Sequence, residues 1–173
     1  MNEIRLLRMQ LSTERHHLRE IAGACAAAST GPLARGGAAA AAWLPACTDY
    51  LRCVLAWFDE RDARLAAIYA RLPAGDPGRE TAAALDPGGG GREALERLAA
   101  AGAAHPAWQE LVRFIDGPWD RRRTAAEALL ATNPRVADWR AFAGIDADSI
   151  CRERALYARC RAALSADNAL GPA

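Results

Sequence analysis

Apolar residues recur every three or four positions along four long stretches of the chain, and no stretch alternates with a period of two. This spacing is typical of amphipathic helices that bury one face. In the first stretch, residues 2–29, the apolar positions are Ile4, Leu7, Leu11, Leu18, Ile21, Cys25 and Ala28. The same spacing predicts further helices over residues 38–72, over residues 92–131, and from Asp146 or Asp148 to Ser165. A short helical turn is predicted over residues 136–145.

Glycine and proline predict where these helices end or bend. Residues 73–91 contain three prolines and a run of four glycines, a composition typical of a surface loop, with room for one helical turn at 80–85. His105-Pro106 and Gly117-Pro118 should break or bend the third helix. We therefore predict an all-α, antiparallel four-helix bundle with a Gly/Pro-rich crossover loop and a kinked third helix. Residues 1–173 should form one domain, with a frayed tail at 167–173.

Each long helix carries a polar residue where its buried stripe requires an apolar one. Charged side chains that are buried need partners, because an unpaired buried charge is costly. If these positions share one level of the bundle, two carboxylates and two guanidiniums would form a neutral layer, with His17 as a core or boundary histidine. The predicted buried polar layer consists of Glu14, Arg61, Arg122 and Glu153.

An alternative interpretation is a metal site. Glu14 and His17 form a Glu-x-x-His pair, the half-site that di-metal carboxylate bundles use. The arrangement resembles the hemerythrin-like and ferritin-like bundles, which hold iron or manganese with inward-facing histidine and carboxylate side chains. That resemblance implies a metal site made from Glu14, His17, Asp62, Asp120 and Glu153.

The sequence also departs from those families. It has no second Glu-x-x-His, its histidines are His16, His17 and His105 alone, and arginines at two stripe positions would repel a cation. We therefore expect a metal site here to be degenerate or lost.

Composition narrows the function further. The 22 basic residues are all arginine and face 21 acids, giving a formal charge of +1, so the totals do not predict nucleic-acid binding. Five cysteines, an odd number without a CxxC pair, suggest reduced thiols and a cytoplasmic setting. No hydrophobic leader is visible, and the longest apolar run, 38–44, is too short to span a bilayer. We find no nucleophile–base pair and no phosphate-binding glycine loop, so no catalytic residue is predicted.

These observations favour a non-enzymatic bundle of hemerythrin-like type in a binding or sensing role. One alternative is a di-iron or di-manganese oxygen-binding or redox protein using Glu14, His17, Asp62 and Glu153. Another is a protein–protein interaction module, whose partner would be a second copy or an unidentified protein.

Overall fold

The computed structural model describes residues 3–30, 38–84, 90–101, 106–132 and 135–169, and all regular structure in these ranges is helical. The prediction of an all-α chain is therefore confirmed for this part of the protein. In chain order the helices are α1 (Glu3–Thr30), α2 (Ala38–Tyr69), α3 (Pro77–Ala84), α4 (Gly90–Ala101), α5 (Ala107–Phe114), the π-helix η2 (Ile115–Trp119), α6 (Asp120–Ala131), α7 (Val136–Ala143) and α8 (Ala147–Ala169). Within these ranges no helix is both long and apolar enough to cross a membrane.

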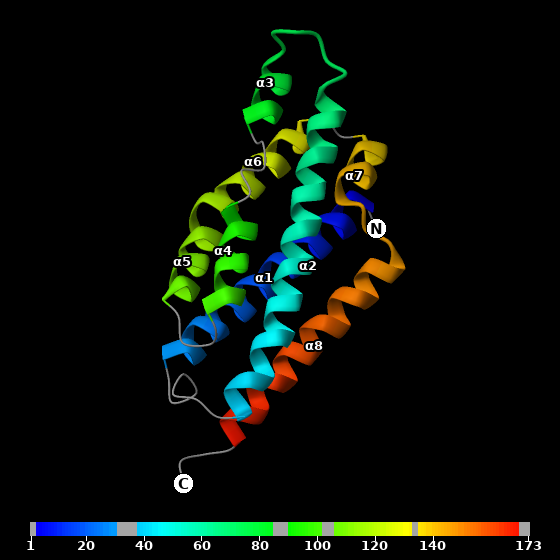
Figure 1. Ribbon diagram of the computed structural model, residues 1–173. Coiled ribbons are helices and arrows are strands. Elements are labelled where there is room, and N and C mark those ends of the chain that lie inside the picture. The colour runs from blue at the N-terminus through cyan, green and yellow to red at the C-terminus, as the bar shows by residue number, and fades with distance from the viewer. Residues whose placement is uncertain (1–2, 31–37, 85–89, 102–105, 133–134, 170–173) are drawn as a thin grey trace.

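Helix α2 lies at the centre of the arrangement and contacts α1, α3, α4, α7 and α8. Figure 1 shows α8 running beside α2 in the opposite direction, while α5, η2 and α6 follow one another as a continuous rod on the other side. Helix α1 packs against α2, α5, α7 and α8. Residues far apart in the sequence therefore meet along the faces of α1 and α2.

The apolar interior consists of two clusters. The larger one includes Trp43 and Trp108, whose ring centroids are 5.6 Å apart, and lies among α1, α2, α4, α5 and α8. The smaller one includes Leu65 and Trp139 and lies among α1, α2, α3, α6 and α7. On α1, α2 and α6 the boundary between the two clusters falls at charged residues, because residues before and after them belong to different clusters. We call this boundary the polar layer; it contains Glu14, Arg61, Asp62 and Arg123.

Several predicted boundaries shift in the structure. Helix α2 ends at Tyr69 instead of residue 72, because the chain tightens into a turn in which Leu72 N–H donates to the Tyr69 carbonyl. The segment predicted as a crossover loop holds the eight-residue helix α3 and the first two residues of α4, whereas residues 85–89 lie outside the described ranges. Asp146 caps α8 by accepting the Ser149 N–H at 2.7 Å. The last helix reaches Ala169, so the frayed tail predicted from 167 is helical up to that residue.

The interruption predicted at Gly117-Pro118 is a π-helical turn. Proline cannot donate a backbone hydrogen bond, and its ring conflicts with the carbonyl four residues earlier. The chain bypasses this conflict by pairing the Asp120 N–H with the Ile115 carbonyl, five residues back. A π turn contains one extra residue, so it rotates the following helix relative to a regular α-helical pattern. Arg123, not Arg122, consequently faces the interior in α6.

Candidate functional site

The first part of the polar layer is a buried ion pair between α1 and α2. A terminal nitrogen of Arg61 lies 2.6 Å from Glu14 Oε2, and both side chains are almost completely buried. Arg61 Nε also donates to the Ala143 carbonyl at 2.8 Å, and its guanidinium lies 4.7 Å from the centroid of the Phe58 ring. Gln10 donates to the other Glu14 oxygen at 3.2 Å. Charge, hydrogen bonds and ring contact together hold this pair in place.

The second part of the polar layer joins α2 to α6. Arg123 forms a hydrogen-bonded ion pair with Asp62 and donates to the Phe58 carbonyl at 3.1 Å. Burial lowers the pKa of Arg123 to about 10, a value at which the guanidinium stays charged at neutral pH. Arg122, which the sequence placed in the layer, is only partly buried and lies 3.8 Å from Asp62. The prediction for Arg122 was therefore wrong by one position, and the π turn before it is the physical reason.

Glu153 is buried as predicted, but its partners are a histidine and a tyrosine instead of Arg61 or Arg123. Its side chain is 0% exposed, and its Oε1 lies 2.9 Å from His17 Nδ1 and accepts a hydrogen bond from the Tyr50 hydroxyl at 3.1 Å. Its Oε2 is buried and has no hydrogen-bond partner among the described residues. Burial, followed by the negative charge of Glu153, strongly raises the pKa of Tyr50. We call Glu153, His17 and Tyr50 the carboxylate cluster.

A second tyrosine extends this cluster toward the surface. The Tyr157 ring stacks on His17 with centroids 3.8 Å apart, and its hydroxyl donates to Glu20 at 2.5 Å. The sequence pattern predicted Tyr157 in the buried stripe of the last helix, but neither tyrosine was assigned to a candidate site. The available signal was spacing, since Tyr50 follows Cys47 by three positions in the buried stripe of α2 and Tyr157 follows Glu153 by four in α8.

The structure separates Asp120 from the other predicted metal ligands. Asp120 lies at the contact of α1 with α6, 2.5 Å from Arg15 and 2.6 Å from Arg19. Partial burial would raise the pKa of Asp120, but hydrogen bonds and charge attraction from the two arginines outweigh it and lower the pKa. Asp120 is thus the centre of a surface ion-pair network between α1 and α6.

The five predicted ligands do not assemble as a two-metal site requires. Glu14 and Asp62 are bound to arginines, Asp120 lies in its own ion-pair network, and only His17 and Glu153 contact each other. Within the ranges that the structure describes, no three histidine, cysteine, aspartate or glutamate side chains are placed to share one metal ion. These residues therefore do not fit the metal pair that the bundle resemblance implies.

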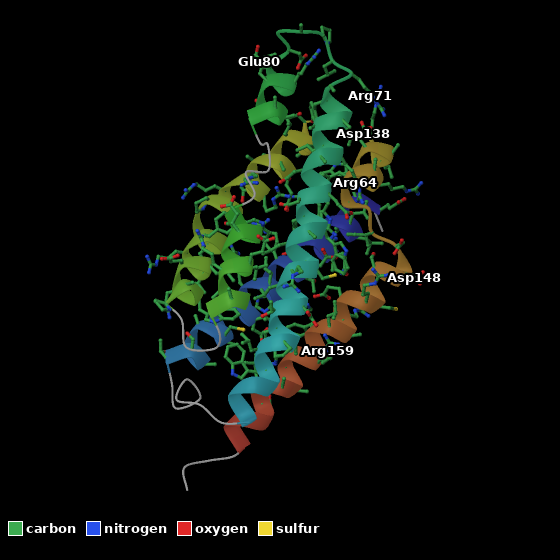
Figure 2. All side chains as sticks on the ribbon, viewed as in Figure 1. Arg64, Arg71, Glu80, Asp138, Asp148 and Arg159 are labelled. Atoms are coloured by element: carbon green, nitrogen blue, oxygen red, sulfur yellow. The ribbon has the colours of Figure 1, made fainter. Side chains whose placement is uncertain are left out.

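Figure 2 labels several charged side chains that lie at the surface of the molecule. Arg71, Glu80 and Asp148 project from the outside of the molecule, where charged side chains are ordinarily found. Glu14, Arg61, Asp62, Arg123 and Glu153 are instead buried. Comparison with protein-family profiles, curated proteins and solved structures gave no match, so the assignment of a function depends on these buried groups.

Proposed function

We propose that this chain is a non-enzymatic binding or sensing protein of hemerythrin-like, four-helix-bundle type, in which internal arginines neutralise the carboxylates that would otherwise hold metal ions. The observation that carries this proposal is the buried ion pair between Arg61 and Glu14, in which a guanidinium nitrogen lies 2.6 Å from Glu14 Oε2. Glu14 is the carboxylate of the Glu-x-x-His motif on α1. Asp62 of α2 and Arg123 of α6 form a second buried ion pair of the same kind.

The electrostatics support this proposal. A metal ion placed against Glu14 or Asp62 would meet the positive charge of a guanidinium that already binds the carboxylate. Displacing that guanidinium would leave it buried without a partner, which costs several kcal/mol. The arginines thus compete with a metal ion for the same oxygens.

The carboxylate cluster supports a sensing role. Glu153 is held by a tyrosine hydroxyl and a histidine rather than by an arginine. The three residues of the cluster come from α1, α2 and α8. A change in its charge or hydrogen bonding would act on three helices at once. Buried polar groups with incomplete partners respond strongly to such changes, because the low local dielectric amplifies them.

Elemental analysis of protein purified without a metal-affinity tag tests the proposal. We expect iron, manganese and zinc well below one atom per chain and no charge-transfer absorption. Stoichiometric iron or manganese that disappears in His17→Ala would overturn the proposal and establish the alternative, a di-iron or di-manganese redox protein. His16→Ala, which changes the exposed neighbour, is the matched control.

A second candidate function is protein binding through α1, favoured by two apolar side chains at the surface. Leu6 is 43% exposed and Met9 55% exposed, and Arg5 and Arg8 lie beside them. The adjoining groove, about 550 Å³, is lined by Ile4, Arg5, Arg8, Met9, Ser12, Arg15 and Glu127. The arginines favour an acidic partner over a symmetric homodimer, in which like charges would meet. Light scattering should find a monomer at every concentration, and a dimer dissociated by Met9→Glu would contradict this choice.

A further inference from the structure

A hollow between α2 and α4 is left unexplained by the buried charges. The two helices lie side by side and contact each other (Figure 1). The hollow has a volume of about 530 Å³, which is within the range of small-molecule pockets. Its floor includes Leu55 of α2 and Leu95 of α4, which are 4% and 1% exposed. We call this hollow the α2–α4 groove.

Two alanines keep the α2–α4 groove open. Ala56 and Ala63 line it from α2, and both are exposed. Asp59 lies three residues after the first and four before the second, so the three residues share one face of the helix. Because alanine carries only a methyl group, no long side chain fills the space at two of these three positions. The groove therefore has an apolar floor and a carboxylate between two small residues.

The charge at the rim of the α2–α4 groove is mainly negative. Among the described residues that line it, one is a cation, Arg52, and three are carboxylates: Asp59, Glu60 and Glu96. Arg52 lies 3.5 Å from Asp49, and Glu60 pairs with Arg64 at 3.0 Å. An ionised carboxylate has about four lone-pair sites, so an existing ion pair leaves it able to accept further hydrogen bonds. The rim thus favours a cationic group over an anionic one.

We propose that the α2–α4 groove binds an amphipathic amine, a protonated amino group carried on an apolar chain. The chain packs on Leu55 and Leu95, where burial of apolar surface is favourable. The ammonium group offers three donors, which Glu96 on α4 and Asp59 on α2 accept at the rim. An anionic ligand would meet like charges. A wholly apolar ligand would take water away from the carboxylates without replacing its hydrogen bonds.

Asp59 connects the α2–α4 groove with the polar layer. Burial lowers the pKa of Arg123, and the negative charge of Asp59 partly offsets this effect. A cation held by Asp59 therefore changes the electrostatic field at the buried Arg123. The inference rests on the proposed binding or sensing role and names the class of ligand. The two can fail separately, because elemental analysis tests for a metal ion and the groove needs none.

Titration of the full chain with n-hexylamine at pH 7, followed by heteronuclear NMR, tests the site. The ligand controls are n-hexanol and hexanoate, which have a six-carbon chain with a neutral and a negative head group. We expect hexylamine to saturate one site per chain, with shift changes concentrated around the groove. Hexanol should bind about tenfold more weakly, because hydrogen bonds to charged groups contribute more than neutral ones, and hexanoate should not bind. Equal affinities for hexylamine and hexanol overturn the proposal. Binding of neither would leave the groove to a basic segment of a partner protein and would overturn it as well.

Two substitutions on α4 separate the groove from general surface charge. Glu96 and Glu93 are both exposed, but Glu93 is not among the residues that line the groove. Glu96→Gln should weaken hexylamine binding by about tenfold and leave hexanol binding unchanged, whereas Glu93→Gln should change neither. Hexylamine affinity that is unchanged in Glu96→Gln, or lowered equally in Glu93→Gln, refutes the site. The comparison of head groups uses the wild type alone and does not depend on any variant folding.

Discussion

Replacing Arg61 by leucine removes the positive partner of the buried Glu14 carboxylate. Among the described residues, Glu14 then keeps only the Gln10 hydrogen bond at 3.2 Å, and the Ala143 carbonyl loses the bond from Arg61 Nε. Breaking a buried ion pair by removing one partner costs about 3–5 kcal/mol. In a chain of this size, 1 kcal/mol shifts Tm by roughly 2–4 °C, so we expect Tm to fall by roughly 6–20 °C.

The double variant Glu14→Leu/Arg61→Leu isolates the charge effect. Apolar side chains of similar volume in place of a buried pair are often neutral or stabilising, so the double variant should recover most of the loss. Arg64→Leu is the matched control, because Arg64 lies on the same helix and pairs with Glu60 at 3.0 Å near the surface. Exposed pairs contribute little, and we expect a change below about 1 kcal/mol.

Urea unfolding followed by circular dichroism at pH 7 measures all three free energies of unfolding. The slope against urea should remain constant, since each variant exposes a similar surface on unfolding. The reasoning is refuted if Arg61→Leu costs no more than Arg64→Leu. It is equally refuted if the double variant is as unstable as Arg61→Leu alone.

Three further predictions concern Arg123, Tyr50 and Asp120. Arg123→Ala should lower the free energy of unfolding in urea by about 3–5 kcal/mol, because it leaves the buried Asp62 carboxylate without its partner. Arg122→Ala should lower it by less than about 1 kcal/mol. Equal losses in the two variants would contradict the rotation of α6 by the π turn. Tyr50→Phe removes a donor from Glu153 and should cost about 1.5–3 kcal/mol, and an unchanged unfolding midpoint would argue against that bond. Folding lowers the pKa of Asp120 from 3.8, so its stabilisation is complete above that value and is lost as pH falls through the lowered pKa. Acid titration of Asp120→Asn should accordingly show a smaller loss of stability below about pH 4 than the wild type shows.

Local pattern was sufficient for the helical class and for much of the buried surface. The spacing of Leu11, Leu18 and Ile21 placed them in the interior, and the structure buries all three. The same spacing identified Glu14, Arg61 and Glu153 as buried charges before any partner was known. Such predictions succeed because helical periodicity alone decides which residues share a face.

Pattern could not assign the partners. Glu153 was predicted to share a layer with arginines, yet it contacts His17 and Tyr50, because partner choice depends on the relative heights of α1, α2 and α8. Gly117-Pro118 predicted an interruption of the helix, but the sequence did not indicate that the interruption would be a π turn with one extra residue. That single residue decides whether Arg122 or Arg123 is buried.

The sequence by itself determined that the chain is helical, where its apolar stripes lie, and that charged side chains interrupt them. Only the tertiary structure decided that Arg61 and Arg123 neutralise Glu14 and Asp62 between two apolar clusters, and that Glu153 is bound by His17 and Tyr50 instead. Periodicity is a local property of one helix. Contacts between helices depend on their heights and rotations, which packing of the whole interior fixes.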